Sequence, residues 1–386
     1  MKFACYTLGC KVNQYETQAM EQLLVQSGHT LGSFDEICDG YIINTCTVTA
    51  VSDKKSRNAI RRVRKLNPQA VVGVCGCYAQ SSPDEIRKLD VDVLIGTDGR
   101  EAFVRHMIDA AQTRQKWDCV DDAGGPRAFE ILPAGGLAAR TRALLKVEDG
   151  CNNFCTYCII PKLRGPYRSV PMEELIAEAK TMAEQGVKEL VLVAQETTIY
   201  GIDLYGKPSL HLLLKELCKI QELYWIRILY CYPEDIYPEL VQTMKEELKV
   251  CHYLDLPIQH ANDEILRRMG RRTSKQELID KIDFLRSEMP DITLRTTLIT
   301  GFPGETKEQH KELLEFINDM EFDRLGVFTY SPEEGTPAAE MDYPPEEIAV
   351  RRAEIINELQ SRVMDEFNEK QRGKTLEVLC EGYDDE

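Results

Sequence analysis

A regular alternation of short apolar runs with amphipathic stretches is the feature that most limits how this chain of 386 residues can fold. Within the first 116 residues, apolar runs that suit strands occupy 3–8, 40–44, 70–74 and 91–95, and helical patterns occupy 13–27, 52–66, 82–88 and 100–112. Such alternation is typical of an open α/β sheet with parallel strands, because each helix returns the chain to the same end of the sheet. We therefore predict an α/β domain over residues 1–116.

A second alternation follows residues 117–141, which glycine and aspartate pairs interrupt and which we predict to be a linker. Strand-like runs then recur at 143–147, 189–194, 225–230, 252–256, 292–299 and 324–329, and every gap but the shortest can hold a helix. Six such units that close partly on themselves predict a partial (βα)6 barrel over residues 142–343. Barrels of this kind carry their chemistry at the C-terminal ends of the strands.

The C-terminal part begins with a proline pair and predicts a connecting helix over residues 344–371. Within it, Ile356, Leu359, Val363 and Phe367 recur at helical spacing, which indicates packing against the rest of the chain. An apolar run at 375–379 suggests the first strand of a further small domain. Residues 372–386 are therefore expected to be the truncated start of that domain.

Charge and cysteine content limit the function. The chain has 47 Lys and Arg against 64 Asp and Glu, a net charge of −17 that excludes a uniformly basic nucleic-acid binder. Residues 1–150 carry no net charge, so the whole excess lies in residues 151–386. No run approaches the roughly 20 apolar residues that span a bilayer, and no signal-peptide core follows the start. Fourteen cysteines without an export signal suggest reduced thiols in a cytoplasmic protein, where metal binding or catalysis is favoured over disulfides.

The strongest chemical motif is a C-x3-C-x2-C run formed by Cys151, Cys155 and Cys158, just after the first predicted barrel strand. Three thiolates at this spacing can hold three irons of a cubane cluster and leave the fourth iron open. An open iron is what S-adenosylmethionine needs for chelation before reductive cleavage. A structural zinc site or buried thiols are the alternatives, but zinc would normally require a fourth Cys or His nearby, and none follows within the next forty residues.

A second set of cysteines is dispersed along the predicted N-terminal domain. Cys10, Cys46 and Cys77 each lie just beyond the C-terminal end of a predicted parallel strand, where an open α/β sheet gathers its ligands. Three convergent thiolates again suit an iron–sulfur cluster with one exchangeable site. Three unconnected buried thiols are an equally acceptable interpretation from spacing alone. Cys75 competes with Cys77, although its position within the strand favours packing.

These two cysteine sets resemble those of the radical S-adenosylmethionine methylthiotransferases, and the resemblance runs from residue 7 to residue 377. It implies that Cys151, Cys155 and Cys158 hold a radical 4Fe–4S cluster and that Cys10, Cys46 and Cys77 hold an auxiliary 4Fe–4S cluster. It further implies two molecules of S-adenosylmethionine per turnover, an electron donor such as flavodoxin or ferredoxin, and no catalytic residue beyond the cluster ligands. By the same resemblance, residues 372–386 would begin a TRAM domain.

Other barrel segments match the family at the predicted strand ends. The resemblance implies cofactor contacts from Gln195 and Glu196, from Gln259, and from the backbone of Gly301 and Gly304. Tyr157, between two of the cluster ligands, is expected to pack near the adenine. For the segment 301–304 a tight turn without a ligand is the alternative, and no phosphate-loop ending follows it. His260 is expected to have a polar role rather than to bind a metal.

Two parts of the chain indicate different substrates. Residues 1–165 are most similar to family members that modify threonylcarbamoyladenosine beside the tRNA anticodon, through residues 8–17, 45–49 and 155–161. From residue 166 onward the chain is similar to members that modify a loop aspartate of a small-subunit ribosomal protein, through residues 194–198, 200–206, 226–233, 259–261 and 325–328. A helix over 54–65 carries seven basic residues and no acid, which suits phosphate binding or, equally, a solvated face without a partner. The acidic second half suits a basic protein. Because the barrel surrounds the reacting hydrogen, we predict the ribosomal-protein substrate and keep tRNA as the alternative.

Overall fold

The computed structural model describes residues 1–47, 50–123, 125, 129–133 and 141–382. The chain divides into two compact units. The first comprises Met1–Asn152 with Ile159–Val187, and the second comprises Asn153–Cys158 with Lys188–Glu386. Among the described residues, no helix is both long enough and apolar enough to cross a membrane.

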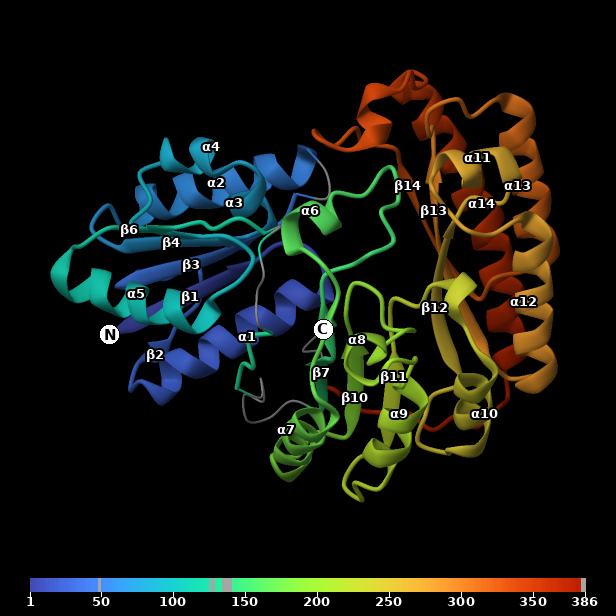
Figure 1. Ribbon diagram of the computed structural model, residues 1–386, viewed down its shortest axis with the longest axis horizontal. Coiled ribbons are helices and arrows are strands. Elements are labelled where there is room, and N and C mark those ends of the chain that lie inside the picture. Colours follow the sequence, from blue (N-terminus) through green and yellow to red (C-terminus); the bar gives the residue numbers. More distant parts are fainter. Residues whose placement is uncertain (48–49, 124, 126–128, 134–140, 383–386) are drawn as a thin grey trace. The chain divides into compact units, whose positions relative to one another are not determined.

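The first unit is built around a parallel sheet of order β2-β1-β3-β4-β5-β6 (Figure 1). Its strands are β1 (Lys2–Thr7), β2 (Thr30–Leu31), β3 (Gly40–Thr45), β4 (Val71–Gly76), β5 (Val93–Ile95) and β6 (Trp117–Cys119). The predicted parallel sheet is confirmed. The predicted linker is wrong at its start, since residues 117–119 add an edge strand beside β5. Residues 124, 126–128 and 134–140 of that linker lie outside the described residues.

Helices cover both faces of this sheet. They are α1 (Lys11–Gln26), α2 (Ala50–Leu66), α3 (Cys77–Ser81), α4 (Pro83–Arg87) and α5 (Arg100–Thr113). One apolar cluster joins Ile60 and Val63 of α2 to Ile43, and the other joins α1 and α5 to Ile42. Successive strand residues point to opposite faces, so β3 supplies both clusters and lies at the centre of the core.

The first unit also contains the segments on either side of the C-x3-C-x2-C motif. Before it come β7 (Arg142–Lys146) and β8 (Glu148–Asp149). After it come α6 (Ile160–Arg164), β9 (Arg168–Ser169) and α7 (Met172–Glu184). The antiparallel pairing of β8 with β9 closes the chain back on itself after α6. The strand predicted over 143–147 is thus confirmed as β7.

The second unit continues the predicted strand–helix alternation. Its strands are β10 (Glu189–Val193), β11 (Trp225–Ile228), β12 (Tyr253–Gln259), β13 (Thr293–Thr300) and β14 (Arg324–Thr329). Strand β10 pairs with β11, and β13 pairs with both β12 and β14; each of these pairings is parallel. Its helices are α8 (Ile202–Tyr205), α9 (Leu210–Cys218), α10 (Pro238–Glu246), α11 (Asp263–Arg268), α12 (Lys275–Glu288), α13 (Lys307–Met320) and α14 (Glu346–Gln371), with short 3₁₀ turns η1 (Pro233–Asp235) and η2 (Pro337–Glu340). The strand ends therefore gather on one edge of each parallel group.

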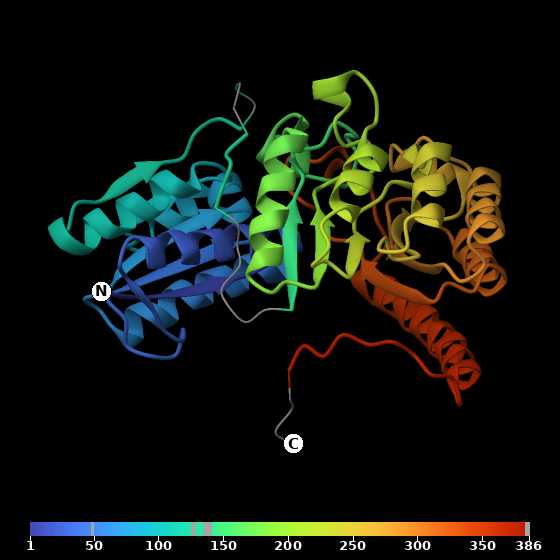
Figure 2. The ribbon, with the colours of Figure 1, turned by 90° about the horizontal axis from the view of Figure 1, so that it is seen from below.

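Helix α14 lies within the range predicted for the connecting helix; it begins after the proline pair and lies against β14. Ile356 is fully buried, and Gln360 donates a hydrogen bond to the carbonyl of Phe322 at 2.8 Å. The strand expected over 375–379 is wrong, because this segment forms neither helix nor strand (Figure 2). Leu376 and Val378 within it are exposed. A single apolar run gains no stable strand conformation unless a neighbouring strand pairs with it. Residues 383–386 lie outside the described residues.

Candidate iron–sulfur and cofactor sites

The three dispersed cysteines follow three adjacent strands of the first sheet. Cys10 precedes α1 after β1, Cys46 directly follows β3, and Cys77 begins α3 after β4. Because these strands are parallel neighbours in the order β1-β3-β4, their C-terminal ends share one edge of the sheet. The predicted convergence of the three thiols at one sheet edge follows from this topology.

Close packing of the loops brings these cysteines together. Gly9 has a φ of +105°, and a Cβ there would lie 2.8 Å from the Cβ and 2.9 Å from the Sγ of Cys46. Only glycine leaves room for this approach. Burial raises the pKa of the Cys77 thiol, and the nearby Cys10 raises it further. Cys46 and Cys77 are buried and Cys10 is half-buried, and the loops that carry them lie close together.

Cys10, Cys46 and Cys77 are not arranged to bind a single metal ion. Among the residues that the structure describes, no three His, Cys, Asp or Glu side chains are close enough to hold one metal ion. A cubane cluster spreads its cysteine ligands over different iron atoms, so it requires a wider triangle of sulfurs than one ion does. The donor set, three cysteines on three adjacent loops, fits such a cluster.

Cys75 has a different environment from Cys77. It lies within β4, is fully buried, and belongs to the apolar cluster beneath α1 and α5. Burial raises the pKa of its thiol to about 12. Cys77 instead packs against Ile159 and Leu163. These surroundings support the packing role expected for Cys75.

A buried ionic network lies beside the dispersed cysteines, and sequence reasoning did not find it. Glu16 of α1 pairs with Arg100 at 2.8 Å, Arg164 at 2.7 Å and Lys146 at 3.1 Å. Burial alone would raise the pKa of the Glu16 carboxyl, but these three cations hold it well below its usual range. Charged residues inside otherwise apolar patterns were the available sequence signal. Their partners are 84 to 148 residues away in the chain, so the pattern did not identify them.

The C-x3-C-x2-C motif contributes residues to both units. In the first unit, Cys151 is buried and its N–H donates to the carbonyl of Gly165 at 3.3 Å. In the second unit, the N–H of Cys158 donates to the carbonyl of Cys155 at 3.0 Å, which makes a tight turn. Thr156 between them donates its hydroxyl to the carbonyl of Arg268 at 2.7 Å. This turn is therefore held from outside the motif.

Cys155 has a hydrogen-bonding partner that sequence reasoning missed. The hydroxyl oxygen of Tyr232 lies 2.6 Å from the Sγ of Cys155. The guanidinium of Arg271 lies 4.2 Å from the centre of the Tyr232 ring and makes two bonds of 2.7 Å to Glu234. The only sequence signal was the position of Tyr232, shortly after β11. A phenol, an arginine and a carboxylate thus support the second cysteine of the motif.

Tyr157 points into the second unit. Its ring meets Phe302 edge-on, with the ring centres 6.4 Å apart, and Phe302 lies in the segment 301–304. Burial raises the pKa of the Tyr157 hydroxyl well above its ordinary value. The predicted adenine neighbour and the predicted glycine loop are thus in contact.

The other predicted contacts follow strand ends of the second unit. Gln195 and Glu196 follow β10, and Gln259 ends β12 with a φ of +70°, a conformation that is rare for residues other than glycine. Glu196 is fully buried, and its carboxylate oxygen accepts the N–H of Thr198 at 2.6 Å. Burial raises the pKa of Glu196 to about 8, so this carboxyl is mostly protonated at neutral pH.

Glu305 anchors the predicted glycine loop after β13. Its carboxylate accepts the N–H of Gly301, and its N–H donates to the carbonyl of Phe302 at 2.9 Å. The carboxylate lies 3.7 Å from His260 Nε2, 3.5 Å from His310 Nδ1 and 3.1 Å from Arg352 Nη1. Although burial opposes ionisation, these partners lower the pKa of Glu305 to about 2. His260 thus has the polar role expected of it.

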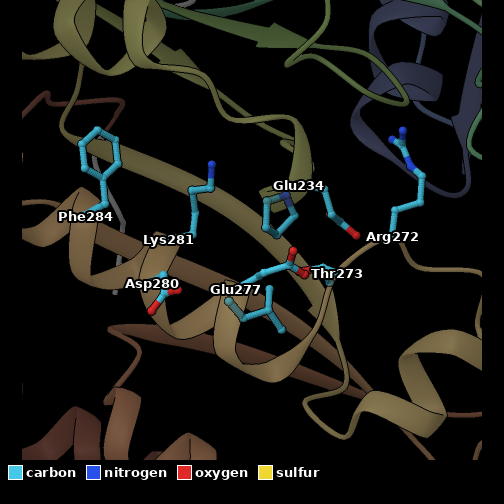
Figure 3. Close-up of a pocket in the computed structure, with 9 residues that line it drawn as sticks. Glu234, Arg272, Thr273, Glu277, Asp280, Lys281 and Phe284 are labelled. Carbon is cyan, nitrogen blue, oxygen red and sulfur yellow. The ribbon is translucent and has the colours of Figure 1, made fainter.

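An open cleft of about 370 Å³ lies between η1 and α12 (Figure 3). Glu234, Arg272 and Lys281 line it, together with Phe284. The Lys281 ammonium donates to the carbonyl of Ile236 at 2.8 Å, and burial lowers its pKa. None of the site residues predicted from the sequence lines this cleft.

Two family models match the chain. One, described as the Radical SAM superfamily, matches residues 145–317, and the other, described as Uncharacterized protein family UPF0004, matches residues 2–96. Among solved structures, the radical S-adenosylmethionine methyltransferase TsrM from Kitasatospora setae has a TM-score of 0.60 at 14% identity, covering 88% of this chain and 77% of that one. The cobalamin-dependent enzyme OxsB has a TM-score of 0.59 at 14% identity, covering 94% and 56%. These likenesses show the shared α/β fold.

Relatives with curated names have a much higher sequence identity to this chain than these solved structures do. The ribosomal protein uS12 methylthiotransferase RimO of Lachnoclostridium phytofermentans is 44% identical over 99% of this chain and 88% of its own length. RimO of Clostridioides difficile is 41% identical over 99% of this chain and 87% of its own length. The matches extend over both sides of residue 166.

Fold and comparisons together define a radical SAM methylthiotransferase, an enzyme class that employs 4Fe–4S clusters and S-adenosylmethionine. Within that class, the chain belongs to the RimO family. The predicted fold class, enzyme class and cofactors are confirmed. The residues that hold the cofactors remain predictions.

Proposed function

We propose that this protein transfers a methylthio group to an aspartate side chain in a loop of ribosomal protein uS12. The proposal rests on the 44% identity to a RimO enzyme over 99% of the chain. The matched region contains both cysteine sets. We infer the ribosomal protein from the name of this relative. We infer the loop aspartate from the similarity of the barrel segments to family members that modify such a residue.

We assign the radical cluster to Cys151, Cys155 and Cys158, and the auxiliary cluster to Cys10, Cys46 and Cys77. When bound, the clusters and S-adenosylmethionine supply the carbon radical and the sulfur that joins it. The protein holds and orients these groups. The thiol of Cys155 is fixed by Tyr232, and Tyr157 with the Gly301 backbone offers a surface for the nucleoside.

The buried carboxyls control charge around the proposed S-adenosylmethionine site. Glu305 stays ionised and orients the N–H of Gly301, so the loop presents its remaining backbone groups in one arrangement. Glu196 is mostly protonated at neutral pH and, with Gln195 and Gln259, provides polar contacts after the neighbouring strands. Glu196 and Glu305 are buried, whereas Gln195 and Gln259 are half-buried.

The charge distribution supports a protein substrate. All of the net charge of −17 lies after residue 150, within the region that carries the predicted barrel, and would repel RNA phosphates while attracting a basic protein. The relatives support no tRNA substrate. We further infer that a one-electron donor such as flavodoxin or ferredoxin reduces the radical cluster, and that the reaction takes place in the cytoplasm.

The test offers both substrates to the anaerobically reconstituted chain. One tube holds the uS12 loop peptide and the other holds an anticodon stem-loop with threonylcarbamoyladenosine, and each is analysed by mass for a methylthio group. Gain on the peptide alone is expected. Gain on the RNA alone would overturn the substrate proposal.

Cysteine variants test the ligand assignment. Cys155→Ala is expected to abolish formation of 5′-deoxyadenosine, whereas Cys46→Ala is expected to leave it but to abolish methylthio transfer. As a control, Cys119→Ala removes an exposed thiol and should change neither product. Loss of 5′-deoxyadenosine in both Cys46→Ala and Cys155→Ala would contradict the division into two sites.

A further inference from the structure

Asn13 joins two of the cysteine-bearing loops of the first unit. It lies in the first turn of α1, three residues after Cys10, and is fully buried. Its side-chain Nδ2 donates to the carbonyl of Leu8 at 2.8 Å and to the carbonyl of Thr45 at 3.0 Å. Leu8 precedes Cys10 by two residues, and Thr45 directly precedes Cys46. One amide group therefore sets the distance between the loop after β1 and the loop after β3.

The backbone of Asn13 strengthens this connection. Its carbonyl accepts the side-chain amide of Asn44, near the end of β3, at 3.0 Å. The neighbouring Gly9 packs against Cys46 with no room for a Cβ. The start of α1 is thus fixed against the end of β3 by both the side chain and the main chain of Asn13.

Arg164 orients the Asn13 amide. Its Nη2 donates to Asn13 Oδ1 at 2.9 Å, and its Nη1 donates to Glu16 at 2.7 Å and Asp149 at 3.0 Å. Arginine has donors only, so the amide oxygen must face it and the amide nitrogen must face the two loop carbonyls. The buried acids keep the guanidinium in place, which makes the orientation of Asn13 unique.

The same segment reaches the third cysteine. Arg164 ends α6, and Ile159 and Leu163 of this segment pack directly on Cys77. The carbonyl of Leu163 accepts the Thr97 hydroxyl at 2.5 Å, which secures the segment against the sheet. Through Asn13, Arg164 is therefore connected to the loops that carry Cys10 and Cys46. It also lies in the same short segment as Ile159 and Leu163, which pack on Cys77.

We propose that Asn13 and Arg164 are a positioning pair that sets the separation of the three loops bearing Cys10, Cys46 and Cys77, and thereby the retention of the auxiliary cluster. Neither residue is assigned to touch a reacting atom. The inference rests on the proposed ligand role of these cysteines. Outer residues that orient ligands typically change metal affinity by about 10- to 100-fold when replaced.

The experiment isolates the auxiliary site within the chain of 386 residues. A reference chain carries Cys151→Ala, Cys155→Ala and Cys158→Ala, so that only the cluster of Cys10, Cys46 and Cys77 is reconstituted. Asn13→Asp is then introduced, because aspartate keeps the oxygen that faces Arg164 but has no donor for the carbonyls of Leu8 and Thr45. It also adds a negative charge beside Cys10, which the variant Arg164→Lys described below does not. Asn67→Ala is the matched control, since Asn67 likewise donates its amide to a loop carbonyl, that of Cys38, at 3.0 Å.

The measurements are iron and sulfide per chain, the EPR spectrum of the reduced cluster, and the rate of iron loss to a chelator. We expect Asn13→Asp to lose iron about tenfold faster or more, with a changed spectrum, whereas Asn67→Ala behaves as the reference. Equal retention and an unchanged spectrum in Asn13→Asp would overturn the inference. A reference chain that binds no cluster would instead overturn the ligand assignment in the proposed function, and the inference with it.

A second variant covers the case in which Asn13→Asp does not fold. Arg164→Lys keeps a positive charge for Glu16 and Asp149, but its single nitrogen cannot hold both acids and Asn13 as the guanidinium does. We expect a folded chain by circular dichroism, with iron loss faster than in the reference. Cluster retention equal to that of the reference in Arg164→Lys would contradict the role of the pair.

Discussion

The two units fix their functional loops by opposite electrostatic means. In the first unit a neutral amide, Asn13, ties the loops after β1 and β3, and a buried arginine orients it. In the second unit a charged carboxylate, Glu305, ties the loop after β13, with two histidines and an arginine around it. Both side chains are buried, yet only Glu305 can change its charge with pH.

The difference in charge between Asn13 and Glu305 matches the chemistry proposed for the auxiliary-cluster site and for the S-adenosylmethionine site. The Sγ of Cys10 lies 4.0 Å from Asn13 Oδ1, so a carboxylate at residue 13 would place a negative charge beside a thiolate. S-adenosylmethionine, proposed to lie near the Gly301 loop, carries positive groups that tolerate an anion. A neutral anchor therefore suits a thiolate site, and a charged anchor suits a site for a cationic cofactor.

Removal of the charged anchor is expected to have the largest effect. Glu305→Ala leaves Arg352 and two buried histidines without their carboxylate, and breaking a buried ion pair in this way typically costs about 3–5 kcal/mol. Urea unfolding of the chain measures this loss. Glu358→Ala, at an exposed residue in the middle of α14, is the control and should change stability by less than about 0.5 kcal/mol. A loss as small as that of the control would show that Glu305 is not an anchor.

Acid titration sharpens the same contrast. The folded pKa of Glu305 is about 2 and is lower than in the unfolded chain, so its stabilisation is present above about pH 4.5 and is lost as pH falls toward 2. By linkage this amounts to roughly 3 kcal/mol. The measurement is the difference in unfolding free energy between the parent chain and Glu305→Gln at pH 7 and pH 3. A difference that does not shrink at pH 3 would contradict the charged anchor.

A third prediction concerns the support of Cys155 in the second unit. Tyr232→Phe removes the hydroxyl at 2.6 Å from its Sγ and is expected to lower stability by about 1 kcal/mol. Hydrogen bonds to cluster sulfurs influence reduction potential, so the proposed radical cluster should become harder to reduce while the auxiliary cluster is unchanged. EPR-monitored redox titration separates the two signals. Tyr224→Phe, at an exposed residue, serves as the control.

The strand ends were predictable from the sequence, but the anchors were not. Short apolar runs placed Cys10, Cys46 and Cys77 after parallel strands, because that signal is local. Asn13 and Arg164 are 151 residues apart, and nothing local in either segment indicates the other. The edge strand at 117–119 was missed since it has three residues beside a glycine-rich stretch. The apolar run at 375–379 was overinterpreted because a pattern does not supply a pairing partner.

The smallest effect on cofactor binding at pH 7 is expected from Glu196, a second buried glutamate of the second unit. Burial raises the pKa of Glu196 to about 8, so it is mostly protonated at pH 7, and Gln reproduces its shape and its acceptor for the N–H of Thr198. Glu196→Gln should therefore change the KM for S-adenosylmethionine by less than about threefold at pH 7, a free-energy change below one hydrogen bond.

The sign of the pH effect is opposite to that of Glu305. A carboxyl whose folded pKa is raised destabilises the fold increasingly as pH rises from about 4.5 to 8, because the unfolded chain releases its proton first. Glu196→Gln should thus be more stable than the parent chain at pH 9 and less advantaged at pH 5. Thermal unfolding at these two pH values measures the difference. An equal advantage at both would mean that Glu196 is ionised in the folded protein, and the two glutamates would then no longer differ in charge at neutral pH.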